Sequence, residues 1–287
     1  MANKKLKAPV NIPVEKIHPF EGHPYKVLDN DEMNTLIESI QQKGVISPIV
    51  VRPLENTTDE YELISGHRRL RASVKAGLET VPALIYAVSR DEAAIILVDS
   101  NLHREHILPS EKAFAYKLKS EALKHQGKRS DLTSVQVAPK LATEQIGETE
   151  NISKDTVKRY IRLTYLIPEL LNLVDEERIA FTPAVELSYL NEVEQADLVE
   201  EIRVCDATPN LSQAQRLRAI SREEGLTPEH IGEILAEEKA NQREKIKIPA
   251  ERIRKYFPKS YTTEQIEEAI IKICESRYRA RQGRDAR

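Results

Sequence analysis

The stretch YELISGHRRLRASVKAG, residues 61–77, joins a strand-like run to a helix-like run across a single glycine. Its first five residues predict a short strand, and the segment that opens near Arg68 predicts a helix. Gly66 has no Cβ, so a ligand can approach its backbone closely. The start of the helix aims unpaired N–H groups and the positive end of its dipole at the same place. Together with the guanidinium groups of Arg68 and Arg69, this arrangement predicts an anion site for a polyphosphate.

The motif alone is weak evidence, since two arginines that open a helix are more often surface charge. The sequence contains no GxxxxGK[ST], so the stretch is not a Walker loop. GVISPIVVR, residues 44–52, adds a glycine turn, Ser47 and Arg52 to the same small domain. Oxygen ligands that suit Mg²⁺ occur in DSNLHREHILPSEKA, residues 99–113. That segment gathers polar side chains at a helix-to-helix junction: Asp99, Asn101, Arg104 and Glu105.

Composition bounds the class of protein. A length of 287 residues allows two or three domains, and 40% hydrophobic with 31% charged residues indicates a soluble globular chain. The sequence contains no run of about 18 apolar residues, so it predicts no membrane span. Its basic start lacks the apolar segment of a secretory signal. Cys205 and Cys274 lie far apart and form neither a disulfide framework nor a zinc pair. This cysteine usage fits a reducing cytoplasm.

The order of strand and helix signals predicts an α+β protein with three domains. Residues 1–109 form a small mixed α/β domain of three or four strands, with Asn30 and Gly44 bounding one of its helices. Residues 110–226 form an all-helical domain, and residues 227–287 form a short, mainly helical region.

Capping residues mark where further helices begin. We expect GKRSDLTSVQ, residues 127–136, to be a loop. The predicted helix starts are Ser89 with Glu92, Ser110, Ser153, Thr182–Pro183, Ser212 with Gln215, Thr227–Pro228, and Thr262 with Gln265.

The segment TEQIGETENISKDTVKRYIRLTYL, residues 143–166, has the pattern of a helix-turn-helix. Its second helix, capped by Ser153, turns an apolar face inward and repeats cations every four residues on another face. This is the layout of a recognition helix, whose early residues reach base edges. The predicted DNA contacts are Lys128, Arg129, Ser153, Lys154, Thr156, Lys158, Arg159 and Arg162.

An ordinary solvated helix face is the alternative interpretation of these charges. The net charge of −3 excludes a uniformly basic coat, but bases concentrate at 124–129, at 154–162 and after 276. A local basic face binds phosphates whatever the total charge. The cap and turn before the second helix, together with the basic stretch 124–129, favour DNA binding.

These motifs, in this order, resemble the ParB/RepB/Noc family of bacterial centromere-binding proteins over roughly residues 10–225. The family's G-x-x-Q-P-[LI]-x-V-R resembles residues 44–52, and its G-E-R-R-x-R-A resembles residues 66–72. Its E-N-[LI]-Q-R-x-x-L resembles residues 100–107, and the helix-turn-helix follows in the family's position. The resemblance implies a ParB/sulfiredoxin-like N-terminal domain that binds CTP with Mg²⁺.

The resemblance also assigns roles to single residues. Nucleotide contacts fall on Ser47, Arg52, Gly66, His67, Arg68, Arg69, Asn101 and Arg104. Asn101 is the implied Mg²⁺ ligand. Ser47 and His67 replace the family's Gln and Glu, and Ser100 replaces the Glu implicated in CTP hydrolysis. Ser100 and the neighbouring Asp99 are the catalytic candidates, although one residue along a helix turns a side chain by about 100°. Binding of CTP is therefore better supported than its hydrolysis to CDP and phosphate.

The family's mode of action implies a DNA clamp. A homodimer recognises an inverted-repeat site on double-stranded DNA, and CTP favours a closed ring that slides along DNA for chromosome, plasmid or mobile-element partitioning. The segment Lys4–Lys7 is the expected docking point of a ParA-type ATPase. The expected dimer interface lies on the apolar side of the last helix, at Ile266, Ile270 and Ile273. We expect a cytoplasmic, nucleoid-associated protein without membrane contact.

Two other classes of protein compete with a clamp. The first is an enzyme: sulfiredoxin shares the N-terminal fold, and its Gly-Cys-His-Arg resembles residues 65–68. Glycine stands at the position of its catalytic cysteine, so sulfinate reduction is excluded. A nuclease on this fold stays an alternative, although the sequence offers no convincing carboxylate cluster for it. The second is a nucleotide-independent DNA-binding regulator, of transcriptional or nucleoid-occlusion type. The residues at 47, 67 and 100 support that alternative.

Overall fold

The computed structural model describes residues 8–55, 57–102, 104, 106–130, 138–237, 253–258 and 260–285. Side chains are not described at 127–130, 138–141, 263, 278 and 280–285. The chain divides into two compact units, Met1–Glu237 and Glu238–Arg287. The described elements confirm the predicted α+β class.

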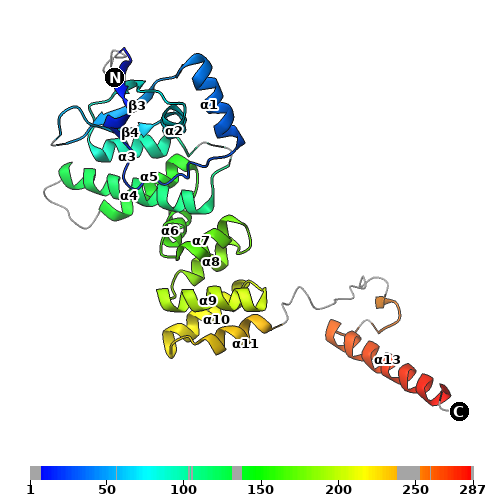
Figure 1. Cartoon of the computed structure of the whole chain (residues 1–287). Helices are drawn as coiled ribbons and strands as arrows, with labels where there is room; N and C mark the ends of the chain where they lie inside the picture. The colour runs from blue at the N-terminus through cyan, green and yellow to red at the C-terminus, as the bar shows by residue number, and fades with distance from the viewer. Residues whose placement is uncertain are drawn as a thin grey trace. The chain divides into compact units, whose positions relative to one another are not determined.

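In the described part of the first unit, five strands form one mixed sheet in the order β1-β5-β3-β4-β2. Figure 1 labels two of these strands, β3 and β4. The pairs β1/β5 and β3/β4 are antiparallel, and β3/β5 and β2/β4 are parallel. The sequence predicted three or four strands, because β2 has only two residues and shows no alternating pattern. The strands are β1 Val10–Pro13, β2 Ile17–His18, β3 Ile49–Pro53, β4 Tyr61–Ser65 and β5 Thr80–Ile85.

Buried apolar side chains from all five strands pack together as the core of the sheet: Ile12, Ile17, Ile49, Val51, Leu63, Val81 and Ala83. The short 3₁₀ helix η1 (Val14–Lys16) links β1 to β2. Helix α1 (Asp31–Lys43) packs on α2 (His67–Lys75). Asn30 caps α1 and Gly44 ends it at a φ of 69°, so both predicted boundaries are confirmed. The two helices bury Met33, Ile40 and Ala72 between them.

Helix α4 (Pro109–Ser130) joins the sheet domain to the helices that follow. It packs on α3 (Arg90–Asp99), which begins at the predicted capping box of Ser89. It also packs on α5 (Ala138–Glu150) and α6 (Lys154–Leu163). One core runs through these helices, since they share a cluster of buried side chains that includes Ala93, Leu97, Tyr116, Ile146 and Val157.

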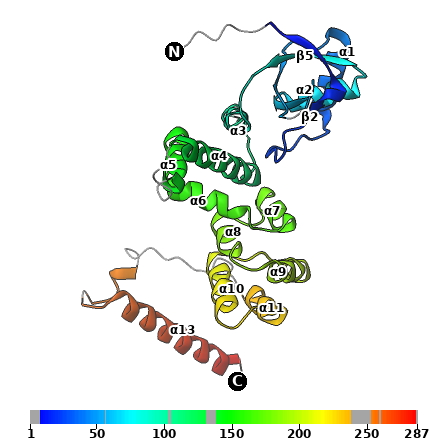
Figure 2. The ribbon, with the colours of Figure 1, turned by 90° about the vertical axis from the view of Figure 1, so that its left-hand side faces the viewer.

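The helices after α6 succeed one another as a bundle (Figure 2). They are α7 Pro168–Asp175, α8 Phe181–Leu187, α9 Glu192–Cys205, α10 Leu211–Glu223 and α11 Pro228–Ala236. Their core includes Leu163, Leu170, Ile179, Leu187, Leu198, Leu217 and Ile231. The domain boundary predicted after residue 226 separates α11 from this bundle, but in the structure α11 packs on α9. The three-domain division remains a prediction.

Two features of α4 differ from prediction. The helix begins at Pro109, and Ser110 lies inside its first turn rather than capping it. There the Ser110 hydroxyl donates a hydrogen bond to Asp175 Oδ2 over 2.6 Å. The predicted loop at 127–136 is wrong in its first part, because α4 continues to Ser130. The rest of that segment lies outside the described residues.

Two other predicted caps are displaced by two residues. Helix α8 follows Ala180, which provides no side-chain cap, so Thr182 lies inside the helix. Helix α10 is capped by Asn210 in a capping box with Gln213, so Ser212 also lies inside its helix. Asn210 caps α10 because its amide oxygen accepts a hydrogen bond from a free N–H of the first turn.

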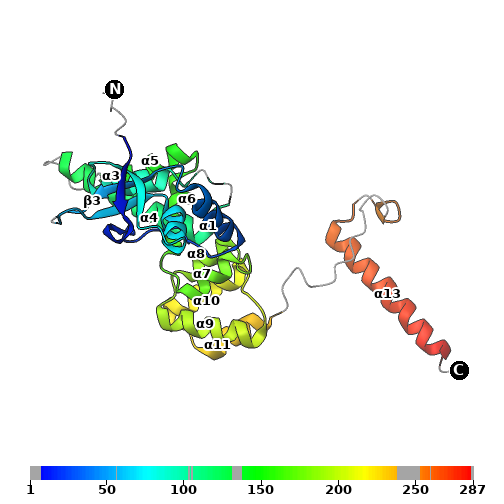
Figure 3. The ribbon, with the colours of Figure 1, turned by 45° about the horizontal axis from the view of Figure 1, so that its top comes forward.

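In the second unit, Figure 3 shows α13 (Thr263–Asp285) as one continuous helix. Its predicted capping box is confirmed, because Thr262 and Gln265 exchange backbone-to-side-chain hydrogen bonds. Of the predicted interface residues, Ile266 is buried and Ile273 is exposed. None of the helices in the described ranges is long and apolar enough to cross a membrane.

Candidate functional site

A cavity of about 250 Å³ lies between the loop before α1, the start of α2 and the end of α3. Its wall is built around the predicted glycine–arginine motif. The lining residues are His23, Tyr25, Lys26, Val27, Ser65, Gly66, His67, Arg68, Arg69, Ser100, Asn101 and Arg104. The structure thus brings together most of the predicted nucleotide contacts, from two motifs that are distant in sequence.

Gly66 is the N-cap of α2 and has a φ of 103°, which an L side chain rarely adopts. A Cβ at this position would lie 2.8 Å from Ile49 Cγ2 and 3.1 Å from Arg69 Nη2. Conformation and space therefore both require glycine here. The bare backbone opens the first turn of α2 to the cavity, where its free N–H groups favour an anion.

The two arginines of the motif are held in different ways. Arg68 forms an exposed ion pair with Glu32 of α1, with 3.0 Å between Nη2 and Oε2. Arg69 Nη1 donates hydrogen bonds to the carbonyl oxygens of Ser47 and Pro48, over 2.6 Å and 2.7 Å. Ser47 thus contributes its main chain to the position of Arg69, and its side chain does not line the cavity.

The imidazole rings of His23 and His67 stack in the cavity, with 3.6 Å between their centroids and 33° between their planes. Within the described part of the chain, Nε2 of His67 is buried without a hydrogen-bond partner. Burial, the neighbouring His23 and Arg104 lower the pKa of His67 to about 3. Burial also lowers the pKa of His23. Both rings are therefore neutral at pH 7.

The loop that carries His23 also contributes Tyr25 and Lys26 to the cavity. The Arg104 guanidinium lies 5.6 Å from the centre of the Tyr25 ring, and burial raises the pKa of that phenol. Lys26 binds Asp175 of α7 (Nζ to Oδ2, 3.0 Å), and its backbone N–H donates to Glu111 of α4. One wall of the cavity is therefore tied to the helical part of the molecule. These loop residues match no motif, and sequence reasoning missed them.

The third motif divides between the cavity and α4. Ser100 and Asn101 line the cavity, and the amide of Asn101 donates to the carbonyl of Leu97 over 2.7 Å. The carboxylate of Asp99 instead accepts a hydrogen bond from Lys119 of α4 and does not line the cavity. Among the described residues, no carboxylate lines the cavity, and no three His, Cys, Asp or Glu side chains gather as a metal cluster.

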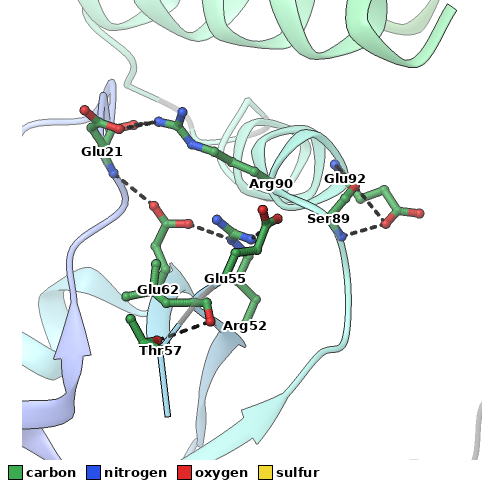
Figure 4. A network of polar contacts seen from close by, with 9 residues as sticks. Glu21, Arg52, Glu55, Thr57, Glu62, Ser89, Arg90 and Glu92 are labelled. Carbon is green, nitrogen blue, oxygen red and sulfur yellow. Dashed lines mark hydrogen bonds and ion pairs between the residues drawn. The ribbon is translucent and has the colours of Figure 1, made fainter. Parts of the chain in front are cut away.

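Arg52 lies in a separate buried network (Figure 4). Its side chain is 4% exposed, and its Nε donates to Glu62 Oε2 over 2.6 Å. Glu62 also accepts from the backbone N–H of Glu21, 3.3 Å away. The structure therefore places Arg52 in the framework that joins β3, β4 and the loop after β2, outside the cavity lining.

The segment predicted to be a helix-turn-helix contains α5, a turn and α6. Asn151 makes the turn at a φ of 55°, and the Ser153 hydroxyl caps α6 by accepting from the backbone N–H of Thr156. Gly147 on α5 faces this turn, because a Cβ there would lie 2.7 Å from the carbonyl oxygen of Ile152. The tight approach of the two helices thus requires this glycine, which sequence reasoning had passed over.

The cations of α6 fall into two groups. Lys154 and Lys158 are exposed and pair with carboxylates of α5 and α6, namely Glu144 and Asp155. Exposed lysines in such pairs exchange partners at little cost, so they remain available to phosphates. Thr156, beside them, is half-buried.

The two arginines of α6 hold the helix to its neighbour α8. Arg159 donates to Thr182 Oγ1 over 2.9 Å. Arg162 donates to the carbonyl of Ser188 over 2.7 Å and lies between the rings of Tyr165 and Tyr189. In this structure both arginines make contacts within the protein. The side chains of the other two predicted contacts, Lys128 and Arg129, lie outside the described residues.

Comparison with known proteins identifies the family of the N-terminal domain. Residues 2–102 match the ParB N-terminal domain family. The nucleoid occlusion protein of Listeria innocua is 33% identical over 194 residues, which are 67% of this chain and 62% of that protein. The chromosome-partitioning protein Spo0J of Thermus thermophilus is 32% identical over 170 residues, which are 59% of this chain and 56% of that protein. The chain thus spans less than two thirds of the length of these relatives.

Solved structures of C-terminally truncated ParB from Caulobacter crescentus are also similar. The complex with the centromeric parS site is 22% identical with a TM-score of 0.40, over 73% of this chain and 98% of that one. The complex with CTP-gamma-S is 25% identical with a TM-score of 0.32, over 69% of this chain and 99% of that one. The family match of residues 2–102 and the identity to the curated relatives decide the assignment. Through its N-terminal domain, this chain belongs to the ParB family.

Proposed function

We propose that this protein is a site-specific DNA-binding clamp of the chromosome-partitioning or nucleoid-occlusion type, and that CTP controls it. The α5–α6 helix-turn-helix binds double-stranded DNA, and the cavity at Gly66 binds the triphosphate of CTP. The names of its curated relatives support the cellular role. The cavity supports the proposal that a nucleotide binds, because residues of this chain give it both its shape and its positive charge.

One observation carries the proposal: every charged group that lines the cavity in the described part of the chain is a cation. Lys26, Arg68, Arg69 and Arg104 converge there on the first turn of α2, and no carboxylate does. A site so charged, with free backbone N–H groups and no Cβ in the way, is built for an anion with several charges. A triphosphate satisfies this requirement.

Mg²⁺ fits the same site as a partner of the phosphates, since it usually binds few protein groups and keeps waters and phosphate oxygens. Asn101 and Ser100 are the oxygen-bearing side chains at that end of the cavity. The cavity offers no side chain suited to activate water for hydrolysis among these candidates, because Asp99 is paired with Lys119 and Ser100 has no carboxylate. We therefore expect bound CTP to be hydrolysed slowly.

Nucleotide and DNA sites are connected through α4. Lys26 connects the cavity loop to α4 through a backbone hydrogen bond and to α7 through an ion pair. The end of α3 also lines the cavity, and α3 packs on α4. Helix α4 in turn packs on both helices of the helix-turn-helix. CTP shifts the conformation only if it binds one arrangement of these helices better than the other. We propose that a homodimer forms through α13 and that a ParA-type ATPase binds at 4–7, which lies outside the described residues.

A nucleotide-independent regulator on the same scaffold is the second candidate. It is favoured by Lys26 and Arg68, which already pair with Asp175 and Glu32 and so gain less from a phosphate. Calorimetric titration with CTP, ATP, GTP and UTP in Mg²⁺ separates the two. Selective binding of CTP, lost in Arg69→Ala, supports the clamp.

The matched control is Arg71→Ala. Arg71 lies on the same helix, pairs with Asp29 and does not line the cavity. We expect this variant to bind CTP like the original protein. If no nucleotide binds to any of the proteins, the clamp proposal is wrong and the regulator remains.

A further inference from the structure

The stacked histidines of the cavity have a chemical property that the sequence motifs do not explain. His67 is the first residue of α2, and His23 comes from the loop 44 residues earlier, yet their rings lie 3.6 Å apart. The Nε2 atom of His67 is buried and has no partner among the described residues. Buried polar atoms without a partner are rare in folded proteins, and they often mark a site where a ligand completes the bonding.

The surroundings keep this pair neutral while the cavity is free of ligand. Burial and nearby positive charge lower the pKa of both rings. The charged groups that face them are all cations: Lys26 on the loop, Arg68 and Arg69 on α2, and Arg104 beyond α3. Tyr25, whose pKa burial raises, stays a neutral phenol. No neighbouring carboxylate lines the described cavity to favour an imidazolium.

A phosphate chain reverses this balance. Two of the four cations are already compensated, since Lys26 pairs with Asp175 and Arg68 with Glu32. Arg69 and Arg104 are left, and the negative charge of a triphosphate exceeds theirs. Bound Mg²⁺ offsets much of this excess, so the field at the rings comes mainly from the nearest phosphate oxygens. One phosphate charge about 4 Å from a half-buried imidazole favours its protonated form by on the order of a thousandfold. Protonation of one ring then becomes favourable in mildly acidic solution, and repulsion between the stacked rings prevents protonation of both.

We propose that the His23–His67 pair takes up one proton from solvent when a phosphate chain binds, and that His67 Nε2–H then donates a hydrogen bond to a phosphate oxygen. The inference rests on the proposed nucleotide binding and deepens it. His67 becomes a ligand-contacting residue in place of the family's glutamate, with a charge that appears only in the complex. The affinity for CTP consequently falls as pH rises, whereas arginines alone would give no such dependence because they stay charged.

Calorimetry of the full chain with CTP and Mg²⁺, in two buffers of different ionisation enthalpy near about pH 5.5, counts the protons taken up. His67→Gln keeps an amide donor but cannot titrate, and His23→Gln removes the other ring. His18→Gln is the matched control, because His18 faces Glu60 and does not line the cavity. The nucleotide's own proton exchange is the same in every sample, so differences between variants belong to the protein.

We expect the original protein and His18→Gln to take up more protons than His67→Gln, by a difference approaching one. We also expect their CTP affinity to fall several-fold per pH unit between about pH 5 and pH 6.5, and that of His67→Gln to change little. Equal proton uptake in the original protein and in folded His67→Gln overturns the proposal. If His67→Gln does not fold, His23→Gln decides in the same way. Absence of binding heat in every protein, the original included, instead overturns the proposed nucleotide function.

Discussion

Asp99, the last residue of α3, accepts a hydrogen bond from Lys119 Nζ of α4 over 2.6 Å. The Lys119 side chain is 5% exposed, so Asp99 compensates a positive charge that is largely shielded from water. The next two residues, Ser100 and Asn101, line the cavity at Gly66. The ion pair therefore lies between the proposed nucleotide site and the helix that supports the helix-turn-helix.

Replacement of Asp99 separates a structural role from a catalytic one. Asp99→Asn leaves the buried Lys119 ammonium without a countercharge, so we expect the free energy of unfolding to fall by about 1–3 kcal/mol. We expect the rate of CTP hydrolysis per bound nucleotide to stay the same, since Asp99 does not line the cavity. Asp206→Asn, at a carboxylate 97% exposed, is the stability control and should change little. Loss of hydrolysis in a stable Asp99→Asn protein contradicts this assignment.

Gly66→Ala tests the backbone of the cavity. The added methyl group meets Ile49 at 2.8 Å in a conformation that alanine disfavours, so we expect a loss of about 1–3 kcal/mol of stability and loss of CTP binding. Gly77→Ala imposes a similar backbone strain, at a φ of 76°, with no atom within 4 Å. It should lose stability but bind CTP. Chemical denaturation and calorimetry of the two variants measure both effects, and equal CTP binding by both contradicts the role of Gly66.

Lys154→Ala with Lys158→Ala tests the DNA-binding face. Because both side chains are exposed, we expect unchanged stability, an affinity for DNA lower by about tenfold or more at moderate salt, and a shallower salt dependence. Lys16→Ala with Lys43→Ala removes the same charge from the sheet domain and is the control. Fluorescence anisotropy over a salt series measures the effect. Equal losses in the two double variants mean that α6 is not the DNA-binding helix.

The pKa of His67 makes stability depend on pH. In the unfolded chain the ring protonates near its ordinary pKa of 6.5, and in the folded protein only near 3. Between these values the unfolded state binds the extra proton, so the free energy of unfolding falls on acidification, by at most about 1.4 kcal/mol per pH unit. Above pH 6.5 this contribution is fully present and constant. His67→Gln should flatten the slope in denaturation curves from about pH 6.5 to 4; an unchanged slope contradicts the burial of a neutral ring.

The sequence predicts features that depend on local chemistry. Gly66 at the mouth of α2, the caps at Asn30, Ser89 and Ser153, and the turn of the helix-turn-helix all follow from the needs of short segments, and the structure contains them. A glycine with positive φ or a serine that accepts from the third N–H leaves a local pattern. Tertiary packing does not need to be known for such features.

The sequence does not predict which side chains of other segments a residue contacts. Arg52 belongs to a motif but is buried against Glu62 of the next strand, and Arg162 belongs to a cationic stripe but lies between the rings of Tyr165 and Tyr189. His23 joins the cavity because its loop folds over α2, and nothing in its own segment indicates this. Motif and periodicity specify which face a residue occupies, but not which distant group that face meets.

The central claim is that nucleotide and DNA sites of one chain are coupled. Its most direct test is the dissociation constant of CTP, measured by calorimetry with and without a duplex selected by the protein from random-sequence DNA. Because coupling is reciprocal, the account predicts that the duplex changes CTP affinity by the factor by which CTP changes DNA affinity, typically about fivefold or more. Identical CTP affinities with and without the duplex, in a protein that binds both ligands, contradict it.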